Sequence, residues 1–99
     1  MKHYTARSQF KQAIEDAVGG GQALFTHAWG LAQGPKCFHG AKRIGKLFDQ
    51  NARRLEETAR HLGVRKVKID RLGKPEQHVD LVGQPLERAI ARAENTGHA

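Results

Sequence analysis

Residues 40–46 have the spacing G-x-x-x-x-G-K, which is typical of loops that bind phosphate groups. In such a loop, backbone N–H groups surround the phosphates, the lysine contacts the terminal ones, and a following Ser or Thr binds Mg²⁺. Here Leu47 follows the lysine, and the strand before the loop would be limited to residues 36–39. We therefore interpret 40–46 as a glycine-containing element that carries three cations, and we predict no nucleotide or other cofactor.

Histidines are the residues best suited to acid–base or metal chemistry, but they are scattered at His3, His27, His39, His61, His78 and His98. Cys37 and His39 form the only close pair of potential ligands, and the sequence has no C-x-x-C, H-x-x-x-H or H-E-x-x-H pattern. We therefore predict no metal site and assign no catalytic residue. A small metal-independent ribonuclease stays open as an alternative, with His39 as acid or base and His78 with Asp80 as a second group.

Positive charge is concentrated in the middle of the chain. Twelve of the seventeen Lys and Arg residues lie in 36–74, where only four carboxylates occur, so this stretch has a formal charge of +8. A concentrated positive field favours a polyanionic or acidic partner. We predict a small basic binding module that contacts DNA or RNA through Lys36, Lys42, Arg43, Lys46, Arg65, Lys66, Lys68, Arg71 and Lys74.

The same surface suits a second kind of partner. A protein-binding adaptor or inhibitor would dock these cations on an acidic protein surface, where charge complementarity supplies association rate and specificity. Both hypotheses describe binding, and no catalytic arrangement in the sequence is complete. We therefore expect a binding protein in preference to an enzyme.

Three segments have the apolar spacing of helices that bury one side. They are residues 6–18, 51–62 and 85–94, in which apolar positions recur every three or four residues. Asn51 or Asp49 is suited to cap the start of the second helix. We expect the three consecutive glycines that follow the first helix, Gly19, Gly20 and Gly21, to end it.

Strands are predicted elsewhere. Residues 22–28 are short, apolar and partly aromatic, as a buried strand is, and residues 41–48 suit either a strand or a short helix. Residues 29–40 are expected to form a loop because glycine and proline interrupt any period. Residues 64–70 and 77–82 are predicted to form a β-hairpin that places opposite charges across the strands.

The register of that hairpin is a specific prediction. It places Ile69 opposite Val79 on an apolar side and Lys68 opposite Asp80 on the polar side. A slip of one residue would exchange the two sides.

Together these elements predict an α+β fold in one domain, residues 1–99. We expect a small two-layer sandwich of three or four strands, including the C-terminal hairpin, with three helices packed mainly on one face. The chain has one cysteine and begins without an apolar leader, which favours a cytoplasmic location. No apolar run approaches the roughly 20 residues that span a bilayer, so no membrane partner is predicted.

Overall fold

The structure is a computed structural model that describes residues 1–28 and 43–96. Its elements, in chain order, are β1 (Lys2–Tyr4), the 3₁₀ helix η1 (Arg7–Gln9), α1 (Phe10–Val18), β2 (Gln22–Ala28), β3 (Arg43–Asp49), α2 (Ala52–His61), β4 (His78–Leu81) and α3 (Gly83–Thr96). The α+β class is therefore confirmed. The predicted loop at 29–40 lies outside the described residues.

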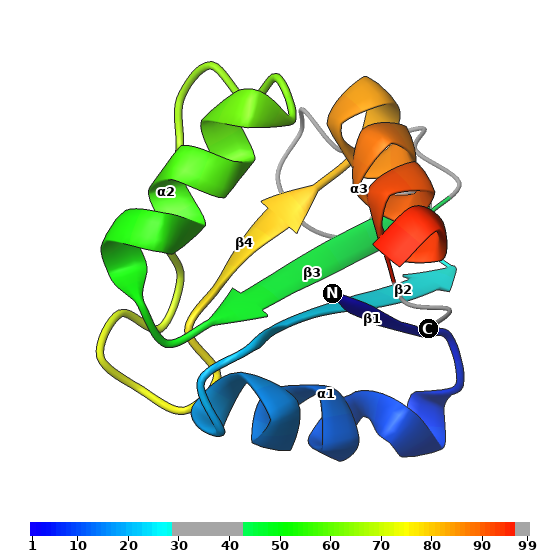
Figure 1. Cartoon of the computed structure of the whole chain (residues 1–99), viewed down its shortest axis with the longest axis vertical. Helices are drawn as coiled ribbons and strands as arrows, with labels where there is room; N and C mark the ends of the chain where they lie inside the picture. The colour runs from blue at the N-terminus through cyan, green and yellow to red at the C-terminus, as the bar shows by residue number, and fades with distance from the viewer. Residues whose placement is uncertain (29–42, 97–99) are drawn as a thin grey trace.

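The four strands form one mixed sheet in the order β1-β2-β3-β4 (Figure 1). β1 runs parallel to β2, while β2 with β3 and β3 with β4 are antiparallel. The strand predicted at 22–28 is confirmed as β2. The segment for which strand and helix were both open is a strand, β3.

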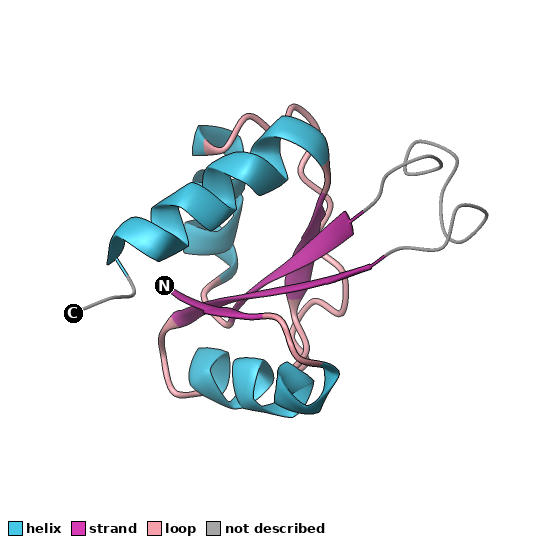
Figure 2. Cartoon of the chain, turned by 90° about the vertical axis from the view of Figure 1, so that its right-hand side faces the viewer, coloured by secondary structure: helices cyan, strands magenta, loops and turns pink. Residues whose placement is uncertain are grey.

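The helices lie on both faces of the sheet, so the prediction of packing mainly on one face is not confirmed. Figure 2 shows α1 below the sheet and α2 and α3 above it. The reason is the alternation of side chains along a strand. In β2, Ala23 and Phe25 pack with α1, whereas Leu24 between them packs in the cluster under α2 and α3. Both faces are therefore apolar, and each needs a helix to cover it.

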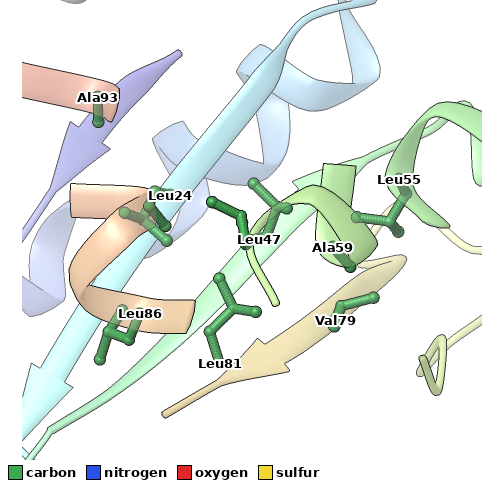
Figure 3. Packing of buried hydrophobic residues seen from close by; sticks show 10 residues of the cluster. Leu24, Leu47, Leu55, Ala59, Val79, Leu81, Leu86 and Ala93 are labelled. Carbon is green, nitrogen blue, oxygen red and sulfur yellow. The ribbon is translucent and has the colours of Figure 1, made fainter. Parts of the chain in front are cut away.

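The larger core lies under α2 and α3 (Figure 3). Its fully buried members come from the sheet and from the two helices above it, and they include Leu24, Leu47, Leu55, Ala59 and Ala89. Gly45 lets α3 approach β3, because a Cβ there would lie 2.4 Å from the Cδ1 atom of Leu86. The absence of a side chain at this position fits the close packing of helix on sheet.

The C-terminal hairpin does not form as predicted. β4 pairs instead with β3, in a register that places Lys46 opposite Asp80. Residues 64–69 form no strand, and the segment meets β4 through one isolated bridge between Asp70 and His78, which does have the predicted register. Val67 and Ile69 still pack on the core as partly buried side chains. Alternation in the sequence identified the apolar side but not the backbone partner of β4.

The helix predictions are confirmed in position. The Asn51 side chain accepts a hydrogen bond of 3.0 Å from the Arg54 N–H and so caps α2. The helix ends at His61, and Gly63 beyond it has a φ of 101°, in the left-handed region. The Val64 N–H then returns to the Ala59 carbonyl at 3.0 Å. Within the described residues, none of the helices has the length and apolar character that crossing a membrane requires.

Candidate nucleic-acid interface

Helix α1 covers only part of its face of the sheet. On that face, cross-strand pairing places Phe25 of β2, Lys46 of β3 and Asp80 of β4 in one row. Phe25 is buried under α1, whereas Lys46 and Asp80 keep 24% and 22% of their side chains exposed. The row therefore passes from core to solvent as it approaches the β4 edge.

Four polar side chains meet at the open end of this row, and we call them the central cluster: Lys46, Asp70, His78 and Asp80. Lys46 Nζ lies 3.0 Å from Asp80 Oδ1 and 3.4 Å from His78 Nε2. His78 Nε2 lies 3.3 Å from Asp80 Oδ1 and 3.9 Å from Asp70 Oδ2. The bridge to β4 supplies Asp70, and because side chains alternate, His78 and Asp80 point to the same face.

A hydrogen bond to the backbone fixes the orientation of the His78 ring. Its Nδ1 lies 2.7 Å from the Glu76 carbonyl oxygen, which can only accept a hydrogen bond, so Nδ1 carries the hydrogen. The side chain is 10% exposed. Nε2 is therefore the ring atom that faces Lys46 and the two carboxylates.

The electrostatics of the cluster favour an ionised Asp80. Burial alone would raise the pKa of this carboxyl, but hydrogen bonds and charge from His78 and Lys46 outweigh burial and lower the pKa to about 2. Asp80 is thus a carboxylate throughout the physiological pH range. Its charge is shared between a lysine and a histidine and is not enclosed by a full set of donors.

A cavity of about 540 Å³ lies on one side of the central cluster. We call it the aromatic cavity, and it is lined by Thr5, Arg7, Phe10, Phe25, His27 and Lys46. Phe10 lies on the apolar side of α1 and is 36% exposed. It packs edge-on against Phe25, with ring centroids 5.1 Å apart, and leaves part of its surface to the cavity.

The aromatic rings continue from this cavity toward the central cluster. Phe25 stands 5.7 Å from His27, and Phe10 also meets Phe48 edge-on at 5.7 Å. Phe48 in turn lies 5.4 Å from His78. A row of rings therefore connects His27 in the aromatic cavity with His78 in the cluster.

A second cavity, of about 570 Å³, lies on the other side and follows the outer edge of β4. We call it the edge groove, and it is lined by Gly63, Val64, Arg65, Lys66, Lys68, Asp70, Val79, Asp80, Leu81, Val82 and Pro85. Arg65 and Lys66 are exposed, and Lys68 keeps 87% of its side chain exposed. Within the described parts of the chain, no carboxylate lies at ion-pair distance from Arg65 or Lys66.

The backbone of β4 also faces the edge groove. His78 exchanges two hydrogen bonds with Asp70, of 3.0 and 2.8 Å, so its N–H and C=O point away from β3. Alternate residues of a strand use the same edge, and the backbone groups of Asp80 therefore point into the groove. The groove combines cations at its rim with polar backbone and apolar side chains on its floor.

The seven predicted contact residues that the structure describes do not form one continuous surface. Lys46, Arg65, Lys66 and Lys68 come together around the central cluster and the edge groove. Arg43 donates to Thr26 Oγ1 at 3.0 Å, on the face that carries Leu24. Arg71 pairs with Glu76 at 3.3 Å, and Lys74 is an exposed turn residue. Lys36 and Lys42 lie outside the described residues, as do Cys37 and His39.

Sequence reasoning did not single out Arg7, Phe10 or His27 for this site. The apolar spacing of α1 assigns Phe10 to the core, and only the fold shows that its ring stands at the margin of the helix. The pairing of Lys46 with Asp80 was also missed, because it depends on which strand lies beside β4. A cation next to an aromatic residue at a helix start is too common a pattern to indicate a site.

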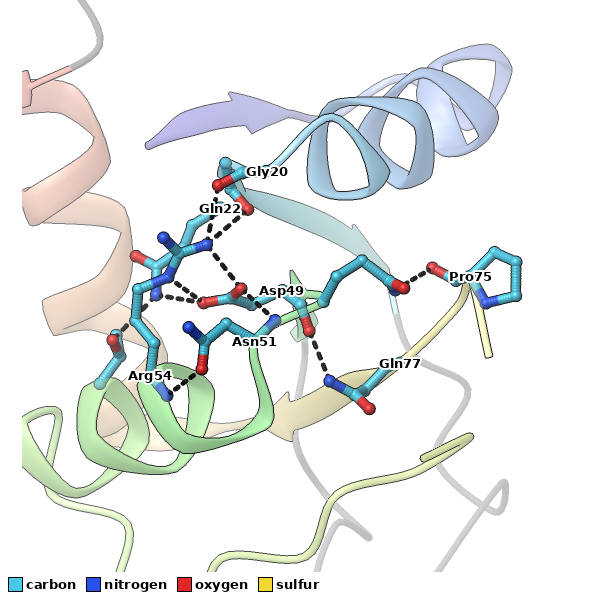
Figure 4. A network of polar contacts seen from close by, with 10 residues as sticks. Gly20, Gln22, Asp49, Asn51, Arg54, Pro75 and Gln77 are labelled. Atoms are coloured by element: carbon cyan, nitrogen blue, oxygen red, sulfur yellow. Dashed lines mark hydrogen bonds and ion pairs between the residues drawn. The ribbon is translucent and has the colours of Figure 1, made fainter. Parts of the chain in front are cut away.

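Another carboxylate network, around Asp49, shows what a purely structural arrangement looks like (Figure 4). Asp49 is fully buried and accepts hydrogen bonds from the Arg54 guanidinium, the Asn51 N–H and the Gln22 amide, at 2.7–2.9 Å. Arg54 also donates to the Gly20 carbonyl at 2.9 Å. The network fastens the start of α2 to the turn between α1 and β2.

The pKa of Asp49 reflects the same enclosure by hydrogen-bond donors. Burial acts to raise it, but the hydrogen bonds from Arg54, Asn51 and Gln22 outweigh burial and lower it. With four donors already on one carboxylate, little capacity is left for a ligand. We therefore assign this network to stability.

Comparisons with protein-family models, with curated proteins and with solved structures find no match to this chain.

Proposed function

We propose that this protein binds single-stranded nucleic acid across the uncovered part of the α1 face and along the β4 edge. The observation that carries the proposal is the Lys46–Asp80 ion pair, which forms the boundary between two different cavities. One cavity offers aromatic rings, and the other offers three exposed cations. Proteins that bind single strands combine these two features, because bases stack on rings while phosphates follow a basic groove.

The phosphate backbone would occupy the edge groove. Arg65 and Lys66 have no carboxylate at ion-pair distance in the described chain, so their charge is available to phosphates. Lys68 lies 3.8 Å from Asp70, and at 87% exposure this weak pair exchanges readily with solvent or ligand. Three cations correspond to about three phosphates and to a log–log salt slope of about −2 for a single strand.

A base would enter the aromatic cavity. Its volume of about 540 Å³ is sufficient for one base, and Phe10 and His27 supply ring surface there. Arg7 at the same cavity is placed to meet the adjoining phosphate. Stacking on one ring is worth about 1–3 kcal/mol and tolerates any base, so the proposal implies little sequence preference.

The aromatic cavity favours nucleic acid over an acidic protein partner. An acidic peptide would use the cations and the free β4 edge, but it would have no need for the aromatic cavity on the far side of Lys46. The two partners therefore differ in their dependence on Phe10. That difference can be measured.

The test is fluorescence anisotropy with a labelled single-stranded oligonucleotide at low salt. We expect binding that weakens as salt rises, and the double variant R65E/K66E should lower the salt slope by about 1.4, because two phosphate contacts are lost. The matched control is R53E/R60E, which changes the net charge equally on the exposed side of α2. It should bind within about twofold of the unaltered protein.

Two results would contradict the proposal. One is the absence of oligonucleotide binding at low salt. The other is an equal loss of affinity in both double variants, which would reduce the effect to net charge alone. Binding of a polyglutamate peptide in place of the oligonucleotide would support the protein-binding alternative.

A further inference from the structure

The central cluster contains three side chains that can serve as metal ligands. Asp70, His78 and Asp80 each offer one ligand atom, and these three atoms all lie within 4.8 Å of one another. The convergence follows from the backbone, since Asp70 and His78 face each other across the bridge and Asp80 follows two residues later on the same face. No such spacing is visible in the sequence.

The hydrogen bonding of the His78 ring is the second observation that points to a metal site. Metal-binding histidines use one ring nitrogen for the metal and donate the other N–H to a carbonyl or carboxylate, which fixes the ring. His78 has this arrangement, with Nδ1 at 2.7 Å from the Glu76 carbonyl oxygen and Nε2 facing both aspartates. The side chain is 10% exposed, so its direction is held by packing.

The distances suit a small divalent ion. Zinc bonds to nitrogen and oxygen of about 2.0–2.2 Å imply ligand atoms roughly 3.3 Å apart in a tetrahedral site. His78 Nε2 is 3.3 Å from Asp80 Oδ1 and 3.9 Å from Asp70 Oδ2, and the three ligand atoms lie within 4.8 Å of one another, so the aspartate side chains must rotate inward to reach tetrahedral spacing. One imidazole and two carboxylates form a donor set for a first-row transition ion, and three protein ligands leave one position open.

Lys46 holds the place of the ion when no metal is bound. Its Nζ lies 3.0 Å from Asp80 Oδ1 and 3.4 Å from His78 Nε2, so the ammonium partly neutralises the same atoms. Lys46 also lines the aromatic cavity, which gives its flexible side chain somewhere to move. Metal and ammonium therefore compete for one set of acceptors.

We propose that Asp70, His78 and Asp80 bind Zn²⁺ in exchange for the Lys46 ammonium group. Both aspartates line the edge groove, with 33% and 22% of their side chains exposed, so an ion can enter from solvent. The proposal does not depend on nucleic-acid binding. Its readouts use the metal alone.

The experiment is calorimetric titration of the purified, untagged chain with Zn²⁺ at neutral pH, together with Co²⁺ as a visible-absorption probe of tetrahedral binding. We expect one ion per chain and a rise in Tm on addition of Zn²⁺. D70N, which changes the most exposed ligand, should weaken binding by at least about tenfold. K46M should strengthen binding by about fivefold or more, because it removes a competing positive charge.

Three control variants locate the site. E76Q and H61A change a half-buried neighbouring carboxylate and an exposed histidine, while C37S removes the only thiol, and all three should bind Zn²⁺ as the unaltered chain does. The proposal is overturned if no Zn²⁺ binds, or if binding is abolished by C37S or unaffected by D70N. It is equally overturned if K46M weakens binding in a protein that circular dichroism shows to be folded, or if Mg²⁺ alone fills the site.

Discussion

Two carboxylates of this protein have a lowered pKa for the same physical reason but in different settings. Asp49 is fully buried and is surrounded by donors from α2 and from β2. Asp80 is partly exposed, shares its charge with Lys46 and His78, and borders the edge groove. The difference teaches that a lowered pKa does not by itself separate a structural carboxylate from a candidate binding residue, and that partial exposure beside cavities is what distinguishes Asp80 from Asp49.

The largest loss of stability is expected from breaking the hydrogen-bond network around Asp49. D49A leaves the Arg54 guanidinium and the Gln22 amide without their acceptor, and the start of α2 loses its attachment to the turn before β2. Removing one partner of a buried pair costs about 3–5 kcal/mol, and because Arg54 is 42% exposed we expect about 3 kcal/mol. Urea denaturation measures the change, and a loss below about 1 kcal/mol would show that Asp49 is not a structural anchor.

The central cluster should make the stability of the protein sensitive to acid. A carboxyl group whose pKa is lowered in the folded state contributes stability above its unfolded pKa, and this contribution is lost as pH falls through the folded value. For Asp80, whose pKa falls from 3.8 to about 2, the loss is about 2 kcal/mol between roughly pH 4 and pH 2.

This acid sensitivity is checked by comparing the pH dependence of unfolding in the unaltered chain and in D80N. The D80N variant should have a shallower decline over the same interval. Identical curves would mean that Lys46 and His78 do not stabilise the ionised form of Asp80 in solution.

A smaller loss of stability should distinguish the two faces of β3, one covered by α3 and the other partly open. Gly45 and Lys46 are adjacent but point to opposite sides of the sheet, and a Cβ at Gly45 would come within 2.4 Å of Leu86 on the closed side. We expect G45A to cost about 1–2 kcal/mol through overpacking, because α3 or the Leu86 side chain must shift. Thermal unfolding measures it, with K46R as the control on the open side, because arginine keeps the positive charge that pairs with Asp80. An equal or smaller cost for G45A than for K46R would contradict the assignment of the faces.

The smallest expected effect is a loss of oligonucleotide affinity when only the aromatic cavity is changed. F10L keeps an apolar side chain against Phe25 but removes the ring that a base would stack on. We expect the affinity for a single-stranded oligonucleotide to fall by about fivefold or more, equivalent to about 1 kcal/mol, with stability nearly unchanged. Full retention of affinity in F10L would remove the aromatic cavity from the interface and favour a partner that needs only the edge groove.

The helices and β2 could be predicted from sequence because local spacing determines them. The stripe that includes Leu55 and Ala59 and the Asn51 cap are properties of one segment. Packing on both faces could not be inferred from alternation alone, although Ala23, Leu24 and Phe25 are consecutive apolar residues, as in a strand buried on both sides.

The site was harder to predict because it depends on pairing between distant segments. The hairpin hypothesis placed Lys68 opposite Asp80, but β3 provides the partner, and Lys46 occupies that position. The short bridge that brings Asp70 to His78 was predicted in register, yet its chemical consequence depended on where Asp80 and Lys46 would lie. Charge concentration in the sequence could not separate cations that are paired in the fold, such as Lys46, from Arg65 and Lys66, which have no carboxylate at ion-pair distance in the described chain.

The most direct test of the account is a titration of the ¹⁵N-labelled protein with a short single-stranded oligonucleotide, followed by amide chemical shifts. The account predicts shifts at Phe10 and His27 in the aromatic cavity, at Lys46, and at Lys66 in the edge groove, while Arg54 in the closed network stays unchanged. Shifts confined to α2, or a spectrum unaffected by a saturating concentration of oligonucleotide, would contradict it.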